Sequence, residues 1–156
     1  MTARQDTIVS LGLFAIVWTI DRLVKALVLA VAPDGSSSDA GFSVSVHRTS
    51  GLVFDTLTGS TPVLLLVIGI VSLLCGVFIH ALRRADRYTA LALALVLAGA
   101  LGNLIDRLAY GYVVDFLVLP GSAVVNIADL AILTGAVLVL VGGFRRPAHA
   151  AHPQAR

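Results

Sequence analysis

The chain has 156 residues, of which 58% are hydrophobic and only 13% are charged. Its mean hydropathy of +0.95 is far above that of a soluble domain of this length, so the composition excludes a soluble enzyme and predicts a membrane protein. No basic stripe is interleaved with aromatic residues, which excludes nucleic acid as a partner. The single cysteine, Cys75, lies in an apolar run and excludes a disulfide within one chain.

Four apolar segments are each long enough to cross a hydrocarbon core, which takes roughly 20 helical residues. We predict helices over residues 8–32, 62–82, 88–108 and 124–144. Residues 33–60 are rich in Gly, Ser and Thr, and residues 42–47 alternate in polarity as a short half-buried strand does. The predicted fold class is an all-α membrane protein with four transmembrane helices and a small extracytoplasmic β element.

Charged residues interrupt the end of the first segment at Asp21, Arg22 and Lys25. Because a cleavable leader would not carry charges there, we expect an uncleaved first helix, with Asp21 and Lys25 paired one turn apart. We expect residues 1–146 to form one membrane-embedded domain, and residues 147–156 to form a disordered cytoplasmic tail.

The basic residues predict the orientation, because Lys and Arg near span ends concentrate on the cytoplasmic side. On a four-span arrangement, most of them fall at the two termini and at the connection between the second and third spans. These residues are Arg4, Arg83, Arg84, Arg87, Arg145, Arg146 and Arg156. We therefore expect both termini in the cytoplasm, and loops 33–61 and 109–123 on the outer side.

Two aspartates, Asp115 and Asp129, flank a turn-rich segment before the fourth span. Gly111, Pro120 and Gly121 end the third helix, so the chain folds back and sets Asp115 beside Asp129. Two carboxylates held close in a poorly hydrated site share one proton, which places a general acid and a general base together. Such a pair can activate water and polarise a peptide carbonyl. It titrates as a unit, so the proton's location stays open.

Polar residues beside this pair are candidates for supporting it. Asn103, Asp106 and Arg107 are spaced to share one face of the third helix. We expect Asn103 and Arg107 to position substrate carbonyls, and Asn126 to orient the aspartates. Asp106 is predicted to form a structural ion pair with Arg107 or to support the site.

Other chemistries fit less well. The histidines are scattered at His47, His80, His149 and His152. Neither a metal nor a cofactor is therefore expected. A nucleophilic Ser50 or Ser122 with Lys25 as base is disfavoured, because Asp21 would keep Lys25 charged. The alternative from another class is a non-catalytic paralogue or a small ion-coupled carrier, whose aspartates relay protons or pair with Arg107.

Five blocks resemble, in order and spacing, those of bacterial lipoprotein signal peptidase, also called signal peptidase II. They are DRLVK at 21–25, SGLVF at 50–54, GALGNLIDR at 99–107, GYVVDF at 111–116 and NIADLAI at 126–132. By this resemblance Asp115 and Asp129 take the places of the two catalytic aspartates. The positions that the family uses for structure or for holding substrate match Asp21, Lys25, Gly51, Asn103, Asp106, Arg107 and Asn126.

The resemblance implies an intramembrane aspartyl endopeptidase of the bacterial cytoplasmic (inner) membrane, with its site at the outer face. Its substrates would be diacylglyceryl-modified prolipoproteins, from which it removes the signal peptide by cutting before the lipidated cysteine. Membrane lipid is the expected surrounding, the cyclic peptide globomycin the expected inhibitor, and a monomer the expected state.

The chain departs from the family pattern at two positions. Thr49 stands where the family's Asn-x-Gly block has asparagine, and threonine has a shorter reach and no NH2 group. This affects the contact that the loop makes with substrate or inhibitor. Arg22 is bulkier than the family's common residue, and we expect it to face the membrane interface or to snorkel.

Overall fold

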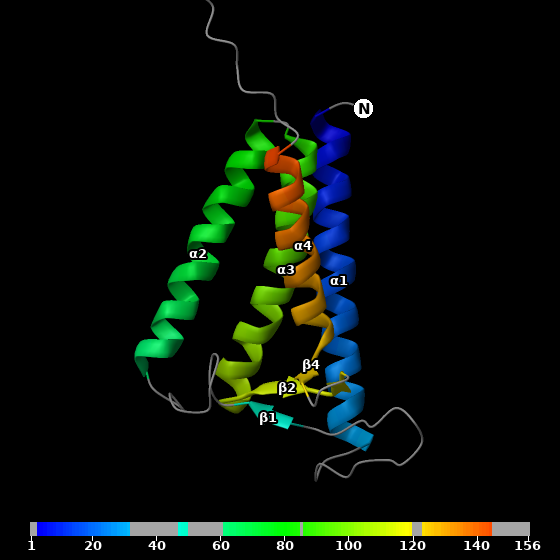
Figure 1. Cartoon of the computed structure of the whole chain (residues 1–156), viewed down its shortest axis with the longest axis vertical. Coiled ribbons are helices and arrows are strands. Elements are labelled where there is room, and N and C mark those ends of the chain that lie inside the picture. The colour runs from blue at the N-terminus through cyan, green and yellow to red at the C-terminus, as the bar shows by residue number, and fades with distance from the viewer. Residues whose placement is uncertain (1–2, 32–46, 50–60, 85, 120–122, 145–156) are drawn as a thin grey trace, which may run out of the picture.

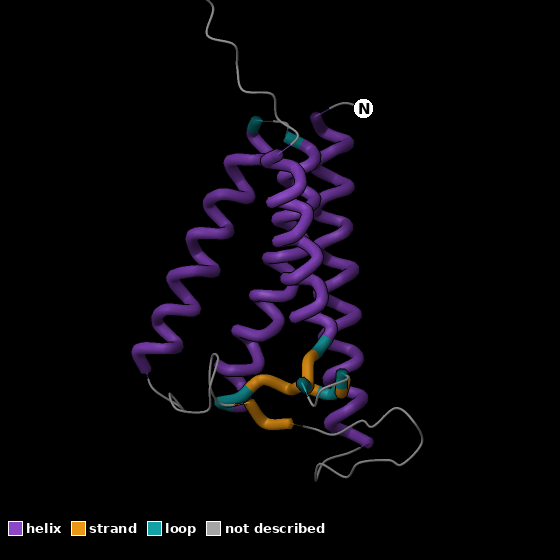
Figure 2. Tube along the Cα trace, viewed as in Figure 1, coloured by secondary structure: helices purple, strands orange, loops and turns teal. Residues whose placement is uncertain are grey.

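The computed structural model describes residues 3–31, 47–49, 61–84, 86–119 and 123–144, and within them the chain forms four helices and four short strands (Figures 1 and 2). The elements are α1 (Ala3–Val31), β1 (His47–Thr49), α2 (Thr61–Arg83), α3 (Arg87–Tyr110), β2 (Val113–Asp115), β3 (Leu117–Val118), β4 (Val124–Val125) and α4 (Ile127–Phe144). The start of α1 and the end of α4 lie at one end of the bundle, and the strands lie at the other (Figure 1).

The four predicted apolar segments are helical, and two of them, α2 and α3, are long and apolar enough to cross a membrane. The predicted start of the fourth helix at residue 124 is wrong. Val124 and Val125 form β4, which pairs antiparallel with β3, and the helix begins at Ile127. A strand of two residues is too short to show the alternation of polar and apolar residues, so the sequence does not distinguish it from the apolar helix that follows.

The ends of α3 follow from two local signals. Asp86 is the N-cap, and its side chain accepts a hydrogen bond from the Thr89 backbone N–H at 3.3 Å. Gly111 is the C-cap with φ of 79°, a left-handed conformation that favours glycine, and its N–H donates to the Arg107 carbonyl. The helix therefore ends at Tyr110, two residues beyond the predicted 108 and directly before the predicted stop at Gly111, and the chain turns into β2.

The strand β2 pairs antiparallel with β1, so that His47 lies opposite Asp115 and Thr49 lies opposite Val113. Of the strand predicted at residues 42–47, His47 belongs to β1, and the rest lies outside the described residues. The predicted tail at 147–156 also lies outside them. The pairing links the segment before α2 to the segment that carries Asp115.

Helix α3 is central and packs on α1, α2 and α4 (Figure 1). Its contact with α4 is close because small residues face each other there. A Cβ at Gly99 would overlap the backbone carbonyl oxygen of Ala128, and one at Gly135 would lie 2.5 Å from the carbonyl oxygen of Ala92. Small residues let helix backbones approach in this way in membranes. The separation of α3 and α4 is therefore set by these glycines.

Helix α2 packs on α3 through an apolar cluster that includes Val71, Phe78 and Leu97. Large apolar side chains also cover the outward faces of the helices and are exposed there. Examples on α1 and α2 are Ile16, Leu23, Leu27, Leu65, Leu66 and Leu73. Such broad exposed apolar surface suits a lipid surrounding rather than water.

The close contact at Gly99 predicts that Gly99→Ala destabilises the bundle by about 1–3 kcal/mol, the usual cost of overpacking a tight core. The matched variant is Gly76→Ala on α2, where an added Cβ meets nothing within 4 Å. Unfolding in detergent micelles titrated with sodium dodecyl sulfate measures both. Equal free energies of unfolding for the two variants would contradict the prediction.

Candidate active site

The first turn of α4 carries one of the two predicted catalytic aspartates. Asn126 precedes the helix, and its side-chain Oδ1 accepts the Asp129 backbone N–H at 2.8 Å. Its own backbone N–H donates to Asp129 Oδ2 at 3.2 Å. This reciprocal arrangement is that of a capping box, which fixes both side chains at the helix end. It also places the Asp129 carboxyl at the positive end of the α4 dipole.

Asp115 ends β2 and is 5% exposed. The Asn126 side-chain amide donates to Asp115 Oδ1 at 2.6 Å and to Asn103 Oδ1 at 3.2 Å. The Asn103 amide in turn donates to Asp129 Oδ1 at 2.7 Å. Asn126 therefore contacts both aspartates, and the two amides together join one carboxylate to the other.

Arg107 lies on α3 beside this network and is half-buried. Its Nη1 donates to the backbone carbonyl of Asn103 at 3.1 Å. Asp115, Asp129 and Asp106 all lie within electrostatic range of its guanidinium. A cation therefore stands next to the aspartate pair.

Of the two alternatives predicted for Asp106, the ion pair with Arg107 is wrong, and the supporting role stays a prediction. Asp106 faces α1 instead, where its Oδ2 lies 2.8 Å from Lys25 Nζ and its Oδ1 lies 2.7 Å from Arg22 Nη1. Neighbouring residues on a helix point in different directions, so adjacency in sequence does not favour a contact.

Asp21, Arg22, Lys25 and Asp106 form what we call the charge cluster. The predicted pairing of Asp21 with Lys25 is present at 3.2 Å, and Arg22 Nη2 lies 3.0 Å from the same oxygen, Asp21 Oδ2. Asp21, Lys25 and Asp106 are at most 2% exposed. Two carboxylates balance two cations here, which is how buried charge is tolerated in a protein interior.

The expectation that Arg22 faces the interface or snorkels is also wrong, because its side chain is only 20% exposed and is directed at two carboxylates. The sequence offers no signal for this contact, since Asp106 belongs to another helix. The position of Arg22 depends on how α1 packs against α3.

The charge cluster is bonded to the segments that carry the aspartate pair. Lys25 Nζ donates to Asn103 Oδ1 at 2.9 Å. Asp21 Oδ1 accepts the backbone N–H of Ala128 at 3.0 Å, and Asp106 Oδ2 accepts that of Val114 at 3.3 Å. Ala128 and Val114 are the residues just before Asp129 and Asp115.

The remaining candidates lie at or beyond the limits of the described structure. Thr49 is placed in β1 by its backbone, and Gly51, Ser50 and Ser122 lie outside the described residues. Lys25, the base of the alternative Ser–Lys site, contacts Asp21, Asp106 and Asn103. Its ammonium group is thus engaged by two carboxylates and one amide oxygen.

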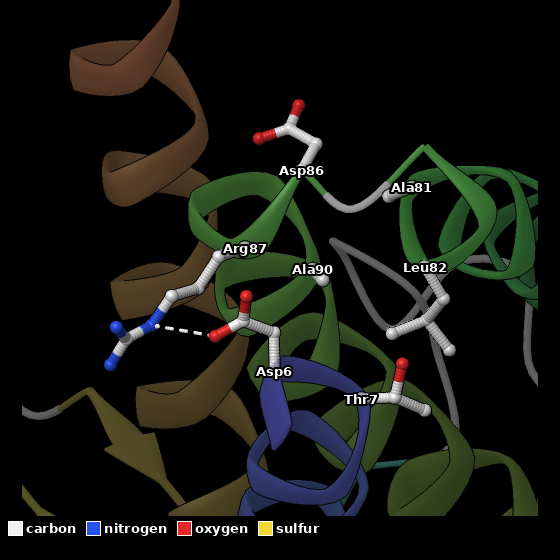
Figure 3. A pocket seen from close by; sticks show the side chains of 7 residues that line it. All are labelled: Asp6, Thr7, Ala81, Leu82, Asp86, Arg87 and Ala90. Carbon is white, nitrogen blue, oxygen red and sulfur yellow. Dashed lines mark ion pairs between the residues drawn. The ribbon is translucent and has the colours of Figure 1, made fainter. Parts of the chain in front are cut away.

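A pocket at the opposite end of the bundle is separate from these residues (Figure 3). It is lined by Asp6, Thr7, Ala81, Leu82, Asp86, Arg87 and Ala90. Arg87 Nε lies 3.5 Å from Asp6 Oδ1, and the Arg87 side chain is half exposed. The pocket contains none of the predicted site residues and belongs to the end of the molecule where α1 begins.

The burial of the charge cluster predicts that Lys25→Met lowers the free energy of unfolding by about 3–5 kcal/mol, because it leaves a buried carboxylate without its partner. Arg87→Gln removes an arginine that is half exposed, so it should cost less, about 1 kcal/mol. Unfolding by sodium dodecyl sulfate compares the two variants. A Lys25→Met protein as stable as Arg87→Gln would show that Lys25 does not stabilise the bundle.

Comparison with known proteins gives the family. The model of signal peptidase (SPase) II matches residues 13–145. A lipoprotein signal peptidase of Mycobacterium leprae (strain Br4923) is 36% identical over 84% of this chain and 69% of its own length. One of Pseudomonas aeruginosa (strain UCBPP-PA14) is 33% identical over 91% of this chain and 92% of its own.

The fold is also shared with solved structures. One bacterial membrane enzyme superposes with a TM-score of 0.77 and 22% identity, covering 95% of this chain and 94% of that one. A second does so with a TM-score of 0.76 and 23% identity over 89% of this chain. The chain is a membrane protein that belongs to the signal peptidase II family of proteases.

Proposed function

We propose that this protein is an intramembrane aspartyl endopeptidase whose catalytic residues are Asp115 and Asp129. The observation that carries the proposal is that Asn126 contacts both carboxylates, at 2.6 Å for Asp115 Oδ1 and through its backbone N–H for Asp129 Oδ2. Both carboxylates are thereby held around one buried side chain, where they can act on the same peptide bond. One carboxylate then takes a proton from attacking water, and the other donates to the scissile carbonyl.

The neighbouring side chains have supporting roles in this mechanism. Asn126 and Asn103 hold the carboxylates by donating N–H groups to them. The half-buried Arg107 is a cation beside the pair, and we assign it to holding substrate carbonyl oxygens. Asp21, Lys25 and Asp106 hold the surrounding backbone, and Thr49 and Gly51 are assigned to the loop that meets the substrate.

The substrates that we propose are diacylglyceryl-modified prolipoproteins, cut before the lipidated cysteine. Family membership supports this, because the relatives are named lipoprotein signal peptidases. The exposed apolar faces of the helices suit a substrate with acyl chains in the surrounding lipid. Globomycin is the proposed inhibitor, and no cofactor is invoked.

We further propose four membrane crossings in the bacterial inner membrane, with both termini in the cytoplasm and the site at the outer face. The bundle supports this, since α1 begins and α4 ends at the same end (Figure 1). Arg83, Arg84 and Arg87 flank the connection between α2 and α3 at that end too, as expected for a cytoplasmic side. Residues 1–146 act as one domain, and the protein works as a monomer.

The mechanism predicts that Asp115→Asn and Asp129→Asn each lower the rate of cleavage by at least about 10²-fold, because an amide cannot take or give the proton. Purified protein and a synthetic diacylglyceryl lipopeptide, with the products separated by mass spectrometry, provide the measurement. Asp6→Asn, at the opposite end of the bundle, is the matched control and should cleave normally. Cleavage retained by either site variant would exclude the mechanism, and a proton-coupled ion flux without product would indicate a carrier.

The departure at Thr49 gives a second test. Restoring asparagine with Thr49→Asn should tighten the binding of globomycin several-fold, because an amide adds a donor and a longer reach. Inhibition of lipopeptide cleavage measures the affinity, with Thr7→Asn at the far end of α1 as the control. An affinity unchanged from the original protein would mean that this loop makes no contact with the inhibitor through position 49.

A further inference from the structure

Arg22 contacts both acidic members of the charge cluster. Its Nη2 lies 3.0 Å from Asp21 Oδ2 on its own helix, and its Nη1 lies 2.7 Å from Asp106 Oδ1 on α3. The planar guanidinium holds its donors in a rigid fork, so one arginine can fix the separation of two carboxylates. Arg22 is therefore a bridge between α1 and α3 at the level of the aspartate pair.

Each carboxylate of this bridge also holds a backbone N–H beside one aspartate of the pair. Asp21 Oδ1 accepts that of Ala128, which precedes Asp129, and Asp106 Oδ2 accepts that of Val114, which precedes Asp115. The separation of the two bridged carboxylates is thus transmitted to the two segments that carry the aspartates.

Lys25 contacts the same two carboxylates but cannot replace Arg22. Its Nζ has three hydrogens, and three acceptors already surround it: Asp21 Oδ2, Asp106 Oδ2 and Asn103 Oδ1. Asp106 Oδ1, a buried oxygen, faces Arg22 instead. Without the guanidinium, Asp106 Oδ1 would lose its nearest cation, and only Lys25 and the Val114 N–H would hold the orientation of this carboxylate.

We propose that Arg22 is a positioning residue, which fixes the spacing of Asp115 and Asp129 through Asp106 and Asp21. The proposal rests on the proposed function, because it assigns the spacing to a catalytic pair. In this role Arg22 sets the geometry of the site, whereas a snorkelling arginine would only extend its charge to the membrane interface.

Two measurements on detergent-solubilised full-length protein test the proposal. Hydrogen exchange at residue resolution follows the N–H groups of Val114 and Ala128, and steady-state cleavage of a diacylglyceryl lipopeptide gives kcat and KM. The variants are Arg22→Gln, which lacks the charge, and Arg22→Lys, which keeps the charge but lacks the fork. Arg87→Gln is the matched control, since it removes an arginine that pairs with Asp6 at the other end of the bundle.

We expect Arg22→Gln to speed exchange of both N–H groups about 10-fold while α3 amides near Ala90 stay protected. We expect kcat to fall at least about 10-fold with KM within about twofold, because misplacement of reacting groups lowers the rate more than the binding. Arg22→Lys should be intermediate, and Arg87→Gln should match the original protein. If Arg22→Gln does not fold, the Arg22→Lys protein decides the question, and it must show faster exchange at Val114 and Ala128 together with a smaller fall in kcat.

Unchanged exchange at Val114 and Ala128 would overturn the proposal, as would faster exchange throughout the bundle or faster local exchange with an unchanged kcat. Failure of the proposed function looks different. In that case the original protein releases no peptide from the lipopeptide, and the exchange measurement still decides whether Arg22 holds the two segments.

Discussion

Charge balance inside an apolar bundle is the constraint on which the rest of the structure depends. Moving a carboxylate or an ammonium out of water costs several kcal/mol even after relaxation, and buried ions are therefore paired. In the charge cluster, Asp21 and Asp106 face Lys25 and Arg22 across the contact between α1 and α3. Their remaining lone pairs accept backbone N–H groups. The same interactions that make these charges tolerable also place the chain around the aspartate pair.

Packing and site geometry coincide at the contact between α3 and α4. The carbonyl oxygen of Ala128 lies against Gly99, while its N–H donates to Asp21. The next residue is Asp129, which is bonded to Asn126 and Asn103. A side chain at Gly99 would therefore move a catalytic candidate as well as a helix. Gly99 therefore contributes to the geometry of the site although it has no side chain.

Hydropathy predicted much of this architecture because burial in lipid is encoded locally, in each apolar run. The turn after α3 could be predicted too, since Gly111 marks the end of that helix, and Asp115 in the returning segment contacts Asn126. The partner of Asp106 could not be predicted. Which residue on α1 reaches it depends on the rotation and depth of one helix against another, and no local pattern records either quantity. For the same reason β4 could not be predicted, because its two residues form a strand only by pairing with β3.

The order in which the chain is made gives the charge cluster a further consequence. Helix α1 brings Asp21, Arg22 and Lys25 to the membrane and so carries one unbalanced positive charge. Asp106, which neutralises it, arrives only with α3, and Asp129 only with α4. During synthesis α1 therefore carries this unbalanced charge until it packs against α3. A nascent chain that stops before its last helix contains α1, α2 and α3 with a balanced charge cluster, but it lacks Asp129, one of the two proposed catalytic residues.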